Sequence, residues 1–357
     1  MTQSKDQLTA EAIALLKQLI QTESFSRNEG NVSDWMEAYL CSKDQVVERF
    51  NNNIWTWAAK PDPAKPTILL NSHLDTVRPS DKWQYDPFGA LEEEDRLIGL
   101  GSNDAGGPLV ALMAAFFLLK EKEQPFNLVF AATAEEEISG PKGVASILDR
   151  LGKIDLAIVG EPTRMQMAIA EKGLMVLDCE AHGKTGHAAR DEGVNAIYEA
   201  LDDIQWFKTF SFPKISPHLG PVKMTVTQVE AGSQHNVVPD VCKFVVDVRL
   251  NEHYSNETCF EIIRQHVKCD VKPRSFRLNS SSIGLNHPVV KRGLERGISY
   301  YGSPTTSDQA VMDFTTLKMG PGDSARSHTP DEFIYLSEIE EGVSTYFEML
   351  DGLVISD

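Results

Sequence analysis

The stretch Thr67-Ile68-Leu69-Leu70-Asn71-Ser72-His73-Leu74-Asp75-Thr76-Val77 decides the fold, because it is a short apolar run that ends in a histidine and an aspartate two residues apart. Pro66 precedes the run and Arg78-Pro79 follows it, which is typical of a buried strand. The C-terminal end of that strand presents His73, a side chain suited to binding a metal ion. Asp75 adds a carboxylate that is able to orient the imidazole.

Three later apolar runs end in a similar way. They are Asn127 to Ala132 before Glu135-Glu136-Glu137, Leu156 to Val159 before Gly160-Glu161, and Thr316 to Met319 before a loop that carries His328. In open α/β sheets, ligands bind outside the carboxyl ends of the strands. Each of these residues taken singly could be a surface histidine or a solvated acidic turn. Together, the four segments predict one crevice that holds two histidines and several carboxylates.

A further carboxylate stands before the most apolar segment of the chain. Asp104 is followed by Ala105-Gly106-Gly107-Pro108 and then by Leu109 to Leu119. Small residues and a proline before such a run are typical of a loop that leads into a buried helix. The pattern places Asp104 at the N-terminal end of that helix, close to the crevice. A carboxylate in this position could also be a simple N-cap.

The composition restricts the class of protein. The chain has 357 residues, 41% of them hydrophobic and 24% charged, and a formal net charge of −18. This charge argues against a nucleic acid or an anionic membrane as partner, since both require a basic surface. The five cysteines include no Cys-x-x-Cys pair, the N-terminus is polar, and no apolar run approaches the ~20 residues that span a bilayer. We therefore expect reduced thiols and a cytoplasmic location.

The pattern of hydrophobic residues changes near Gly173. Apolar and polar residues alternate from Met175 to His182, and the order that follows is helix, strand, strand, helix and a last strand near Ser275 to Leu278. This βαββαβ order is that of a ferredoxin-like domain. Because His328 belongs with the earlier candidate ligands, the chain must return to the first domain. We predict a largely parallel α/β catalytic domain, residues 1–172 and 281–357, interrupted by an inserted domain, residues 173–280.

The candidate residues lie in motifs that resemble those of the co-catalytic metallo-amidohydrolases. This family contains acetylornithine deacetylase, succinyl-diaminopimelate desuccinylase and glutamate-releasing carboxypeptidases, and the resemblance covers nearly the whole chain in order. The motifs are Ser72-His73-Leu74-Asp75-Thr76-Val77, Thr133-Ala134-Glu135-Glu136-Glu137, Val159-Gly160-Glu161-Pro162-Thr163, Gly320-Pro321-Gly322-Asp323 and Ser327-His328-Thr329-Pro330-Asp331-Glu332.

The resemblance implies a pair of divalent metal ions, usually zinc, with cobalt or manganese as alternatives. By their motifs, His73 and Glu161 would hold one ion, Glu137 and His328 the other, and Asp104 would bridge the two. Mixed imidazole and carboxylate ligands suit zinc, and two ions about 3.5–4 Å apart can activate water and polarise a carbonyl group.

Other residues gain roles from the same resemblance. Asp75 would hydrogen-bond to His73 and fix its tautomer. Glu136 matches the general base, and its neighbour Glu137 is then left to bind metal. Gly322, in the Gly-Pro-Gly-Asp loop, matches a substrate-binding position. Glu135 stands where an aspartate is more usual and receives no role.

The inserted domain contributes three further candidates. His187, in Gly186-His187-Ala188, matches a histidine that reaches the site of a partner subunit and stabilises the oxyanion, which implies a homodimer formed through this domain. Asn236 and Arg249 match positions that bind the carboxylate of the substrate. A strand arginine is usually only solvated, but a planar guanidinium is well suited to an α-carboxylate.

The expected activity is hydrolysis of the amide bond of a small N-acyl amino acid. The motifs look most like those of the acetylornithine deacetylases of arginine biosynthesis, so N-acetylornithine, N-acetylcitrulline and a succinylated equivalent are the candidate substrates. A dipeptidase, a carboxypeptidase or succinyl-diaminopimelate desuccinylase would use the same metal site. A catalytically silent binding protein on the same fold is the alternative of another class, although all the expected ligand and base positions are present.

Overall fold

The computed structural model describes residues 4–355 and contains two compact units. The first unit comprises the chain up to Ile169, Ser282–Tyr301 and the chain from Ser307 onward, and the second comprises Ala170–Ser281 and Gly302–Thr306. The sequence placed the boundaries at 172/173 and 280/281 and left residues 302–306 in the first domain. The short segment belongs to the second unit because Lys172 N donates to Ser303 O (3.1 Å) and Thr306 Oγ1 donates to Lys172 O (3.1 Å).

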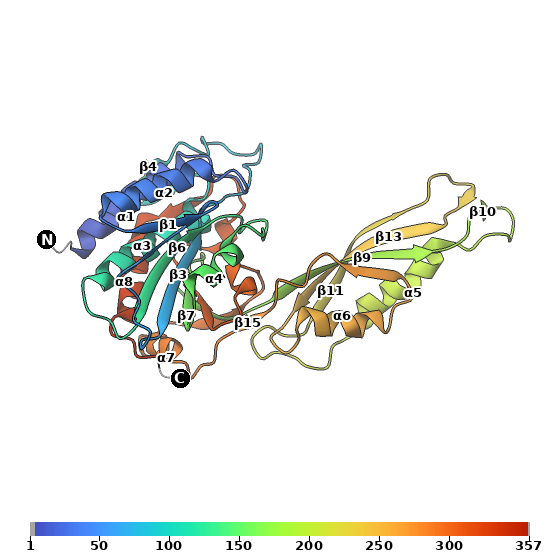
Figure 1. The fold of residues 1–357 in the computed structure, drawn as a ribbon. Helices are drawn as coiled ribbons and strands as arrows, with labels where there is room; N and C mark the ends of the chain where they lie inside the picture. The colour runs from blue at the N-terminus through green and yellow to red at the C-terminus, as the bar shows by residue number, and fades with distance from the viewer. Residues whose placement is uncertain (1–3, 356–357) are drawn as a thin grey trace. The chain divides into compact units, whose positions relative to one another are not determined.

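The first unit is built on a mixed sheet, shown in Figure 1. Its order is β1-β2-β6-β3-β7-β17-β8-β15, with β16 beside β8. The strands are β1 (Val47–Phe50), β2 (Asn53–Trp57), β3 (Thr67–His73), β6 (Asn127–Thr133), β7 (Leu156–Val159), β8 (Met167–Glu171), β15 (Ser281–Ser282), β16 (Tyr300–Ser303) and β17 (Thr316–Lys318). The central strands β6, β3, β7 and β17 are parallel, so their carboxyl ends lie at one edge of the sheet.

Alternate residues of the central strands enter two different cores. Ile68 and Leu70 of β3 join the core that contains the long helices, whereas Leu69 joins a smaller core on the opposite face. Every residue of β3 is buried, as expected for a parallel strand that is covered on both faces. The predicted α/β catalytic fold is therefore confirmed.

Six helices accompany this sheet in the described residues. They are α1 (Lys5–Ile20), α2 (Gly30–Ser42), α3 (Gly107–Lys120), α4 (Leu148–Leu151), α7 (Pro288–Glu295) and α8 (Leu336–Leu350). Helix α3 packs against α1, α8 and β3, and nearly all of its residues are buried. The expectation that no apolar run approaches the length of a membrane span was wrong for one helical segment, Ser102–Lys120, whose 19 residues are long and apolar enough to cross a membrane. Because 89% of its apolar window is buried inside the structure, the apolar composition is explained by packing in the core.

A small three-stranded sheet, β18-β5-β4, lies next to the helical core. Its strands are β4 (Leu91–Glu93), β5 (Arg96–Ile98) and β18 (Phe333–Tyr335). The pairing of β18 with β5 brings the segment after His328 to the segment before Asp104.

The second unit has a four-stranded antiparallel sheet in the order β11-β13-β9-β14. Its elements follow the predicted βαββαβ order, with a two-stranded ribbon of β10 and β12 in addition. They are β9 (Gly173–His182), β10 (Gly186–His187), α5 (Ala196–Thr209), β11 (Lys223–Ala231), β12 (Val237–Val238), β13 (Val241–Leu250), α6 (Asn256–Arg264) and β14 (Asp270–Pro273).

Two details of this unit differ from the prediction. The last strand is Asp270–Pro273 rather than Ser275 to Leu278, because residues 270–273 are the ones that pair with β9. Helix α5 buries only part of the apolar side that its spacing predicts, which consists of Val194, Ile197, Leu201, Ile204 and Phe207. Its buried residues include Ala200 and Phe207, while Ile197 and Leu201 are 36% and 52% exposed. Small alanines allow the helix to approach the sheet closely, and this leaves the larger side chains outside.

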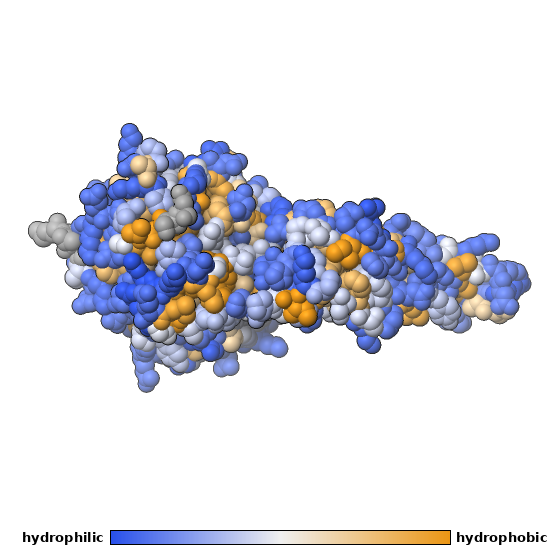
Figure 2. All heavy atoms as spheres, turned by 90° about the horizontal axis from the view of Figure 1, so that it is seen from below, coloured by the Kyte–Doolittle hydropathy of each residue, from blue (hydrophilic) through white to orange (hydrophobic). Residues whose placement is uncertain are grey.

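Most of the surface is hydrophilic, in keeping with the formal net charge of −18. Figure 2 shows this for one face, where hydrophobic side chains form small, separate patches over both units.

Candidate metal centre

The carboxyl ends of the parallel strands present a cluster of histidines and carboxylates in the first unit. Strand β3 ends at His73, the turn after β6 carries Glu136 and Glu137, and Glu161 follows β7. Because these strands are parallel neighbours, the sheet itself brings residues distant in sequence to one edge.

The Nε2 atom of His73 faces three carboxylates. It lies 3.4 Å from Asp104 Oδ1, and 3.9 Å from both Glu136 Oε2 and Glu161 Oε1. The ligand atoms of His73, Glu136 and Glu161 lie within 4.8 Å of one another, and so do those of His73, Asp104 and Glu137. Glu136, the predicted base, is therefore as close to this imidazole as Glu161, the predicted ligand.

The second histidine approaches the same cluster. His328 Nε2 lies 2.8 Å from Glu137 Oε2 and 3.6 Å from Asp104 Oδ2. Asp104 thus turns one oxygen toward each imidazole, which is the arrangement required of a ligand that bridges two cations. The His328 side chain is 54% exposed and that of His73 only 1% exposed, so the cluster runs from the interior toward solvent.

The tautomer of His73 tests whether a cation fits here. Its Nδ1 lies 2.9 Å from the backbone oxygen of Asp75. A carbonyl oxygen only accepts, so Nδ1 carries the proton and Nε2 of the neutral imidazole has a lone pair. This buried Nε2 makes no hydrogen bond within the described residues. Beside several carboxylates this nitrogen requires a positive charge, either its own proton or a metal cation, and a mixed set of imidazole and carboxylate donors suits a divalent metal ion.

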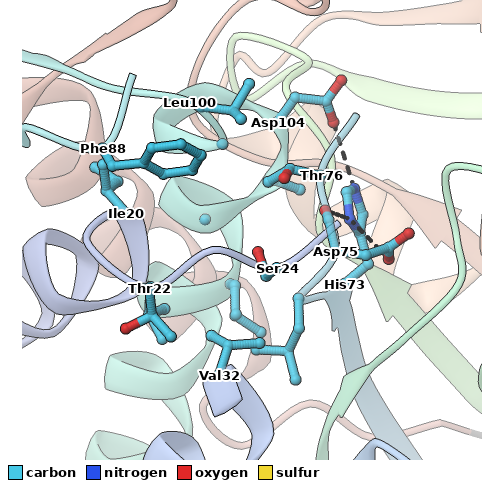
Figure 3. Close-up of a pocket in the computed structure, with 16 residues that line it drawn as sticks. Ile20, Thr22, Ser24, Val32, His73, Asp75, Thr76, Phe88, Leu100 and Asp104 are labelled. Atoms are coloured by element: carbon cyan, nitrogen blue, oxygen red, sulfur yellow. Dashed lines mark hydrogen bonds and ion pairs between the residues drawn. The ribbon is translucent and has the colours of Figure 1, made fainter. Parts of the chain in front are cut away.

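Asp75 acts differently from the prediction. Its carboxylate is 3.5 Å from His73 Nδ1, farther than its own backbone oxygen. The carboxylate instead accepts from Ser26 Oγ (2.7 Å), Glu136 N (3.0 Å) and Glu137 N (3.2 Å). The residue therefore orients His73 through its main chain, and its side chain holds the turn that carries the two glutamates. Figure 3 shows His73, Asp75 and Asp104 together.

Asp104 is not a helix cap. Helix α3 has no side-chain N-cap hydrogen bond, and Asp104 precedes it in an irregular turn, Ser102–Gly106, with a cis peptide bond to Ala105. The backbone N–H groups of Asn103 and Asp104 in this turn, and of Gly101 just before it, donate to the side chain of Glu332.

Several carboxylates lie close together in this buried cluster, and they shift the pKa values of its members. Burial opposes protonation of His73, but Asp104, Asp75, Glu136 and Glu161 outweigh it and raise its pKa well above the usual range. Burial and repulsion by Glu161 raise the pKa of Glu136 well above the usual range. The ion pair with Glu137 raises the pKa of His328 to about 9. Two divalent cations would offset the four negative charges of Asp104, Glu136, Glu137 and Glu161.

A small cavity of about 20 Å³ lies behind His73 and Asp104, and it is the one drawn in Figure 3. Its walls are mainly apolar and include Ile20, Val32 and Phe88. Space of this size holds about one water molecule. The cavity is too small for a substrate, so the substrate must approach the cluster from elsewhere.

Sequence reasoning missed several buried carboxyl groups that support the ligand loops. Glu29 is fully buried and accepts from Arg27 N (2.6 Å) and Glu135 N (3.2 Å). Glu135, which had no predicted role, accepts from Lys142 N (3.1 Å), and a Cβ on Gly140 would lie 2.0 Å from the same Glu135 oxygen. Asp308 accepts from Asn71 and Thr133, at the ends of β3 and β6. No local motif marks Glu29 and Asp308, because the contacts that tie them to the ligand loops, with Glu135 and with Asn71 and Thr133, join residues distant in sequence.

Gly322 has a structural reason to be glycine. Its φ is +87°, and a Cβ would lie 2.5 Å from Asn103 Oδ1. Asn103 Oδ1 accepts from Asp323 N (2.8 Å), so the glycine allows this loop to pack on the turn before α3. A role for Gly322 in binding substrate remains a prediction.

The other three predicted residues belong to the second unit. His187 and Asn236 lie together, because His187 pairs with Val237 and Ala188 N donates to Asn236 O (3.0 Å). Arg249 lies near the other end of β13, where it pairs with Asp247 and donates to Thr306 Oγ1 (3.3 Å). At ~3.3 Å per residue, the run of β13 from Val241 to Arg249 spans roughly 26 Å. Asn236 and Arg249 of one chain therefore do not converge on one small carboxylate.

Comparisons with known proteins identify the family of this chain. Residues 69–352 match the family described as peptidase family M20/M25/M40. A peptidase M20 domain-containing protein, C757.05c, of Schizosaccharomyces pombe is 29% identical, over 95% of this chain and 84% of its own length. The N-acetyl-L-citrulline deacetylase of Xanthomonas campestris is 24% identical, over 91% and 92% of the two chains.

A solved structure also shares the fold. The YXEP protein of Bacillus subtilis, described as a dinuclear metal binding peptidase of the M20 family, matches with a TM-score of 0.75 at 15% identity, over 96% of this chain and 97% of its own. The family match spans most of the sequence and contains every candidate ligand. This chain therefore belongs to peptidase family M20/M25/M40, a family of metal-dependent hydrolases that act on amide bonds.

Proposed function

We propose that this protein removes the acyl group from a small N-acyl amino acid. N-acetylornithine, N-acetylcitrulline and N-succinylornithine are the candidate substrates. The observation that carries the proposal is the single cluster formed by His73, Asp104, Glu136, Glu137, Glu161 and His328. The relative named as an acetylcitrulline deacetylase supports the choice of substrate class.

Five residues of the cluster would bind metal, and the sixth, Glu136, would transfer the proton. His73 and Glu161 would hold one ion, His328 and Glu137 a second, and Asp104 would contact both, with zinc as the first candidate. When bound, such a pair supplies Lewis acidity that activates water and polarises the scissile carbonyl group. Two observations support this assignment: the buried Nε2 of His73 has no hydrogen-bond partner in the described residues, and Asp104 turns one oxygen toward each histidine.

Glu136 is the proposed general base. Its side chain is mostly buried, lies beside His73, and is held in place by the bond from its backbone N–H to Asp75. Burial and the neighbouring carboxylates raise its pKa, which brings it toward the range in which a base can accept a proton and return it. Glu136 would take the proton of the attacking water and pass it to the leaving amine.

The second unit supports the recognition of an anionic substrate. Lys223 pairs directly with Arg249 across β11 and β13, and Lys172, the residue before β9, is close enough to feel the charges of both. Burial lowers the pKa of Lys172, and the charges of Lys223 and Arg249 lower it further. Asp247 is the acidic partner of Arg249 in this group. In a chain of net charge −18, three cations gathered in one place favour a carboxylate ligand.

A homodimer would complete the site. His187 and Asn236 lie together at one end of the second unit and Arg249 near the other, so one chain does not present all three to one small substrate. Exposed Ile197, Tyr198 and Leu201 on α5, beside the edge strand β11, offer an apolar surface for a second copy. We propose that His187 and Asn236 act in the site of the partner subunit.

A turnover panel tests the proposed function. N-acetyl and N-succinyl derivatives of ornithine, citrulline, diaminopimelate and glutamate should be compared with dipeptides, with zinc or cobalt supplied. We expect turnover of at least one N-acyl amino acid and little turnover of dipeptides. Turnover of dipeptides alone would identify a dipeptidase, and binding without turnover of any of them would identify a silent binding protein.

A further inference from the structure

Glu332 is a buried carboxyl group that the proposed chemistry does not use. It is 2% exposed and lies four residues after His328, at the start of the segment that leads into β18. No lysine or arginine in the described part of the chain forms an ion pair with it, and its hydrogen-bond partners are backbone N–H groups. Burying a carboxylate without a cationic partner is costly. Burial and the nearby Asp104 raise the pKa of Glu332, and its hydrogen bonds offset part of that cost.

The partners of Glu332 are all in the turn that carries Asp104. Oε1 accepts from Asn103 N and Asp104 N, both at 2.8 Å, and Oε2 accepts from Gly101 N at 3.1 Å. The main chain of Glu332 is tied to the same region, because Gly99 N donates to Glu332 O (2.9 Å). One side chain therefore satisfies three backbone donors, Gly101, Asn103 and Asp104, at the start of an irregular turn that has no side-chain cap of its own.

A second contact ties the same turn to another segment, the loop Gly320-Pro321-Gly322-Asp323. The side chain of Asn103 accepts from Asp323 N (2.8 Å) and donates to Asp323 O (3.1 Å). Asn103, the neighbour of Asp104, is therefore held through its backbone N–H by Glu332 and through its side chain by Asp323. The Asp104 carboxylate has one oxygen 3.4 Å from His73 and the other 3.6 Å from His328.

We propose that Glu332 is a positioning residue that fixes the backbone of Asp104, and through it the spacing of the two metal sites. The inference rests on the proposed metal centre, but not on the identity of the substrate. Asp104 is the residue that faces both histidines, so a small rotation of its backbone moves it relative to both. Supporting groups of this kind typically change metal affinity by about 10–100-fold when they are replaced.

Three variants distinguish a positioning role of Glu332 from a contribution to general stability and from an effect of its charge alone. Glu332→Gln keeps the size but directs an amide NH2 at a backbone donor. Glu332→Asp keeps the charge but is one methylene too short to reach all three N–H groups. Asp331→Asn is the matched control. Asp331 is the adjacent residue, and its carboxylate accepts from Gln84 N (2.8 Å) and Tyr85 N (3.1 Å), away from Asp104.

The measurements are zinc and cobalt affinity by competition with a chromogenic chelator, the visible spectrum of the cobalt protein, and the thermal midpoint of the metal-free protein. We expect Glu332→Gln and Glu332→Asp to lose about 10–100-fold in affinity and to alter the cobalt spectrum. Asp331→Asn should bind metal as the wild type does. The metal-free midpoints identify any variant that fails to fold.

Two outcomes would overturn the inference. Wild-type affinity and spectrum in Glu332→Gln would show that the side chain does not position Asp104. Loss in Glu332→Gln with full retention in Glu332→Asp would show that only its charge matters. If both variants fail to fold, amide exchange in the metal-free wild type decides, because fast exchange at Asn103 and Asp104 contradicts the proposed hydrogen bonds. Absence of metal binding by the wild-type protein is a different result, and it would remove the metal centre itself.

Discussion

The imidazole of His73 donates its Nδ1 proton to the backbone oxygen of Asp75 at 2.9 Å. The side-chain carboxylate of Asp75 lies farther from His73 Nδ1, at 3.5 Å. The Asp75 main chain therefore sets the tautomer of His73. The Asp75 side chain is free to hold the turn that carries Glu136 and Glu137. One residue thus supports three members of the cluster through two different groups.

Replacement of Glu136 by glutamine tests its role as base. We expect kcat to fall by about 10²–10⁴-fold, because the amide cannot accept the proton, while the other carboxylates and histidines keep the metal content. Metal analysis and steady-state kinetics on one preparation provide the check. Glu121→Gln, at an exposed position in the first unit, is the control. Full activity in Glu136→Gln would refute the assignment.

Replacement of Asp75 by asparagine should affect metal binding and turnover together. An amide in this position no longer accepts from Ser26, Glu136 and Glu137 at once, so the turn that carries both glutamates loses its anchor. We expect a loss of about 10–100-fold in metal affinity. Ser26→Ala removes only one of these bonds and should cost about 1 kcal/mol of stability. If Asp75→Asn and Ser26→Ala had equal effects on metal affinity, the proposed role of Asp75 as the anchor of the turn would be contradicted.

Removal of the metal ions should destabilise the protein. Ions that bind only the folded state add RT ln(1 + [L]/Kd), about 2.7 kcal/mol when the free ion is at 100 times Kd. We expect the thermal midpoint to fall on chelation and to recover when zinc is added. The midpoint of a Glu137→Gln variant should respond less to zinc. An unchanged midpoint in the wild-type protein would contradict the proposed centre.

Replacement of Lys223 by glutamine should raise KM for a carboxylate substrate and leave kcat nearly unchanged. Lys223 forms no ion pair in the described residues and lies directly across from Arg249, so its charge is available to a ligand. A partly exposed charge is worth up to about 1 kcal/mol, which corresponds to a change of roughly two- to fivefold. The difference should shrink at high salt. Lys243→Gln, on β13 near Glu180, is the control.

Asp155 should contribute a pH-dependent part of stability. Burial opposes its ionised form, but hydrogen bonds from Lys153 and from Thr67 N outweigh burial and hold its pKa below the ordinary 3.8. Because the folded pKa is the lower one, the stabilisation is complete above about pH 3.8 and is lost as the pH falls through the folded pKa. The difference in unfolding free energy between the wild type and Asp155→Asn should therefore narrow in acid. A difference independent of pH would contradict this.

The local sequence was sufficient to predict the positions of the strands and helices that have a strong hydrophobic pattern. Strands β3, β6 and β7 lie within a residue or two of their predicted positions, because an uninterrupted apolar run has few alternatives to a buried strand. Periodicity was less informative for α5, where the helix buries small alanines and leaves Ile197 and Leu201 outside. A hydrophobic stripe shows that some surface must cover it, but does not show which surface.

The sequence by itself determined which residues are able to bind metal, because histidines and carboxylates follow apolar runs whose parallel pairing leaves them at one edge. Only the tertiary structure decided how they are held. The acceptor for His73 is a backbone carbonyl, the Asp104 turn is tied to Glu332, and Asn236 lies far from Arg249 along β13. These relationships join residues distant in sequence through main-chain groups, which every residue possesses and which therefore leave no mark in the sequence.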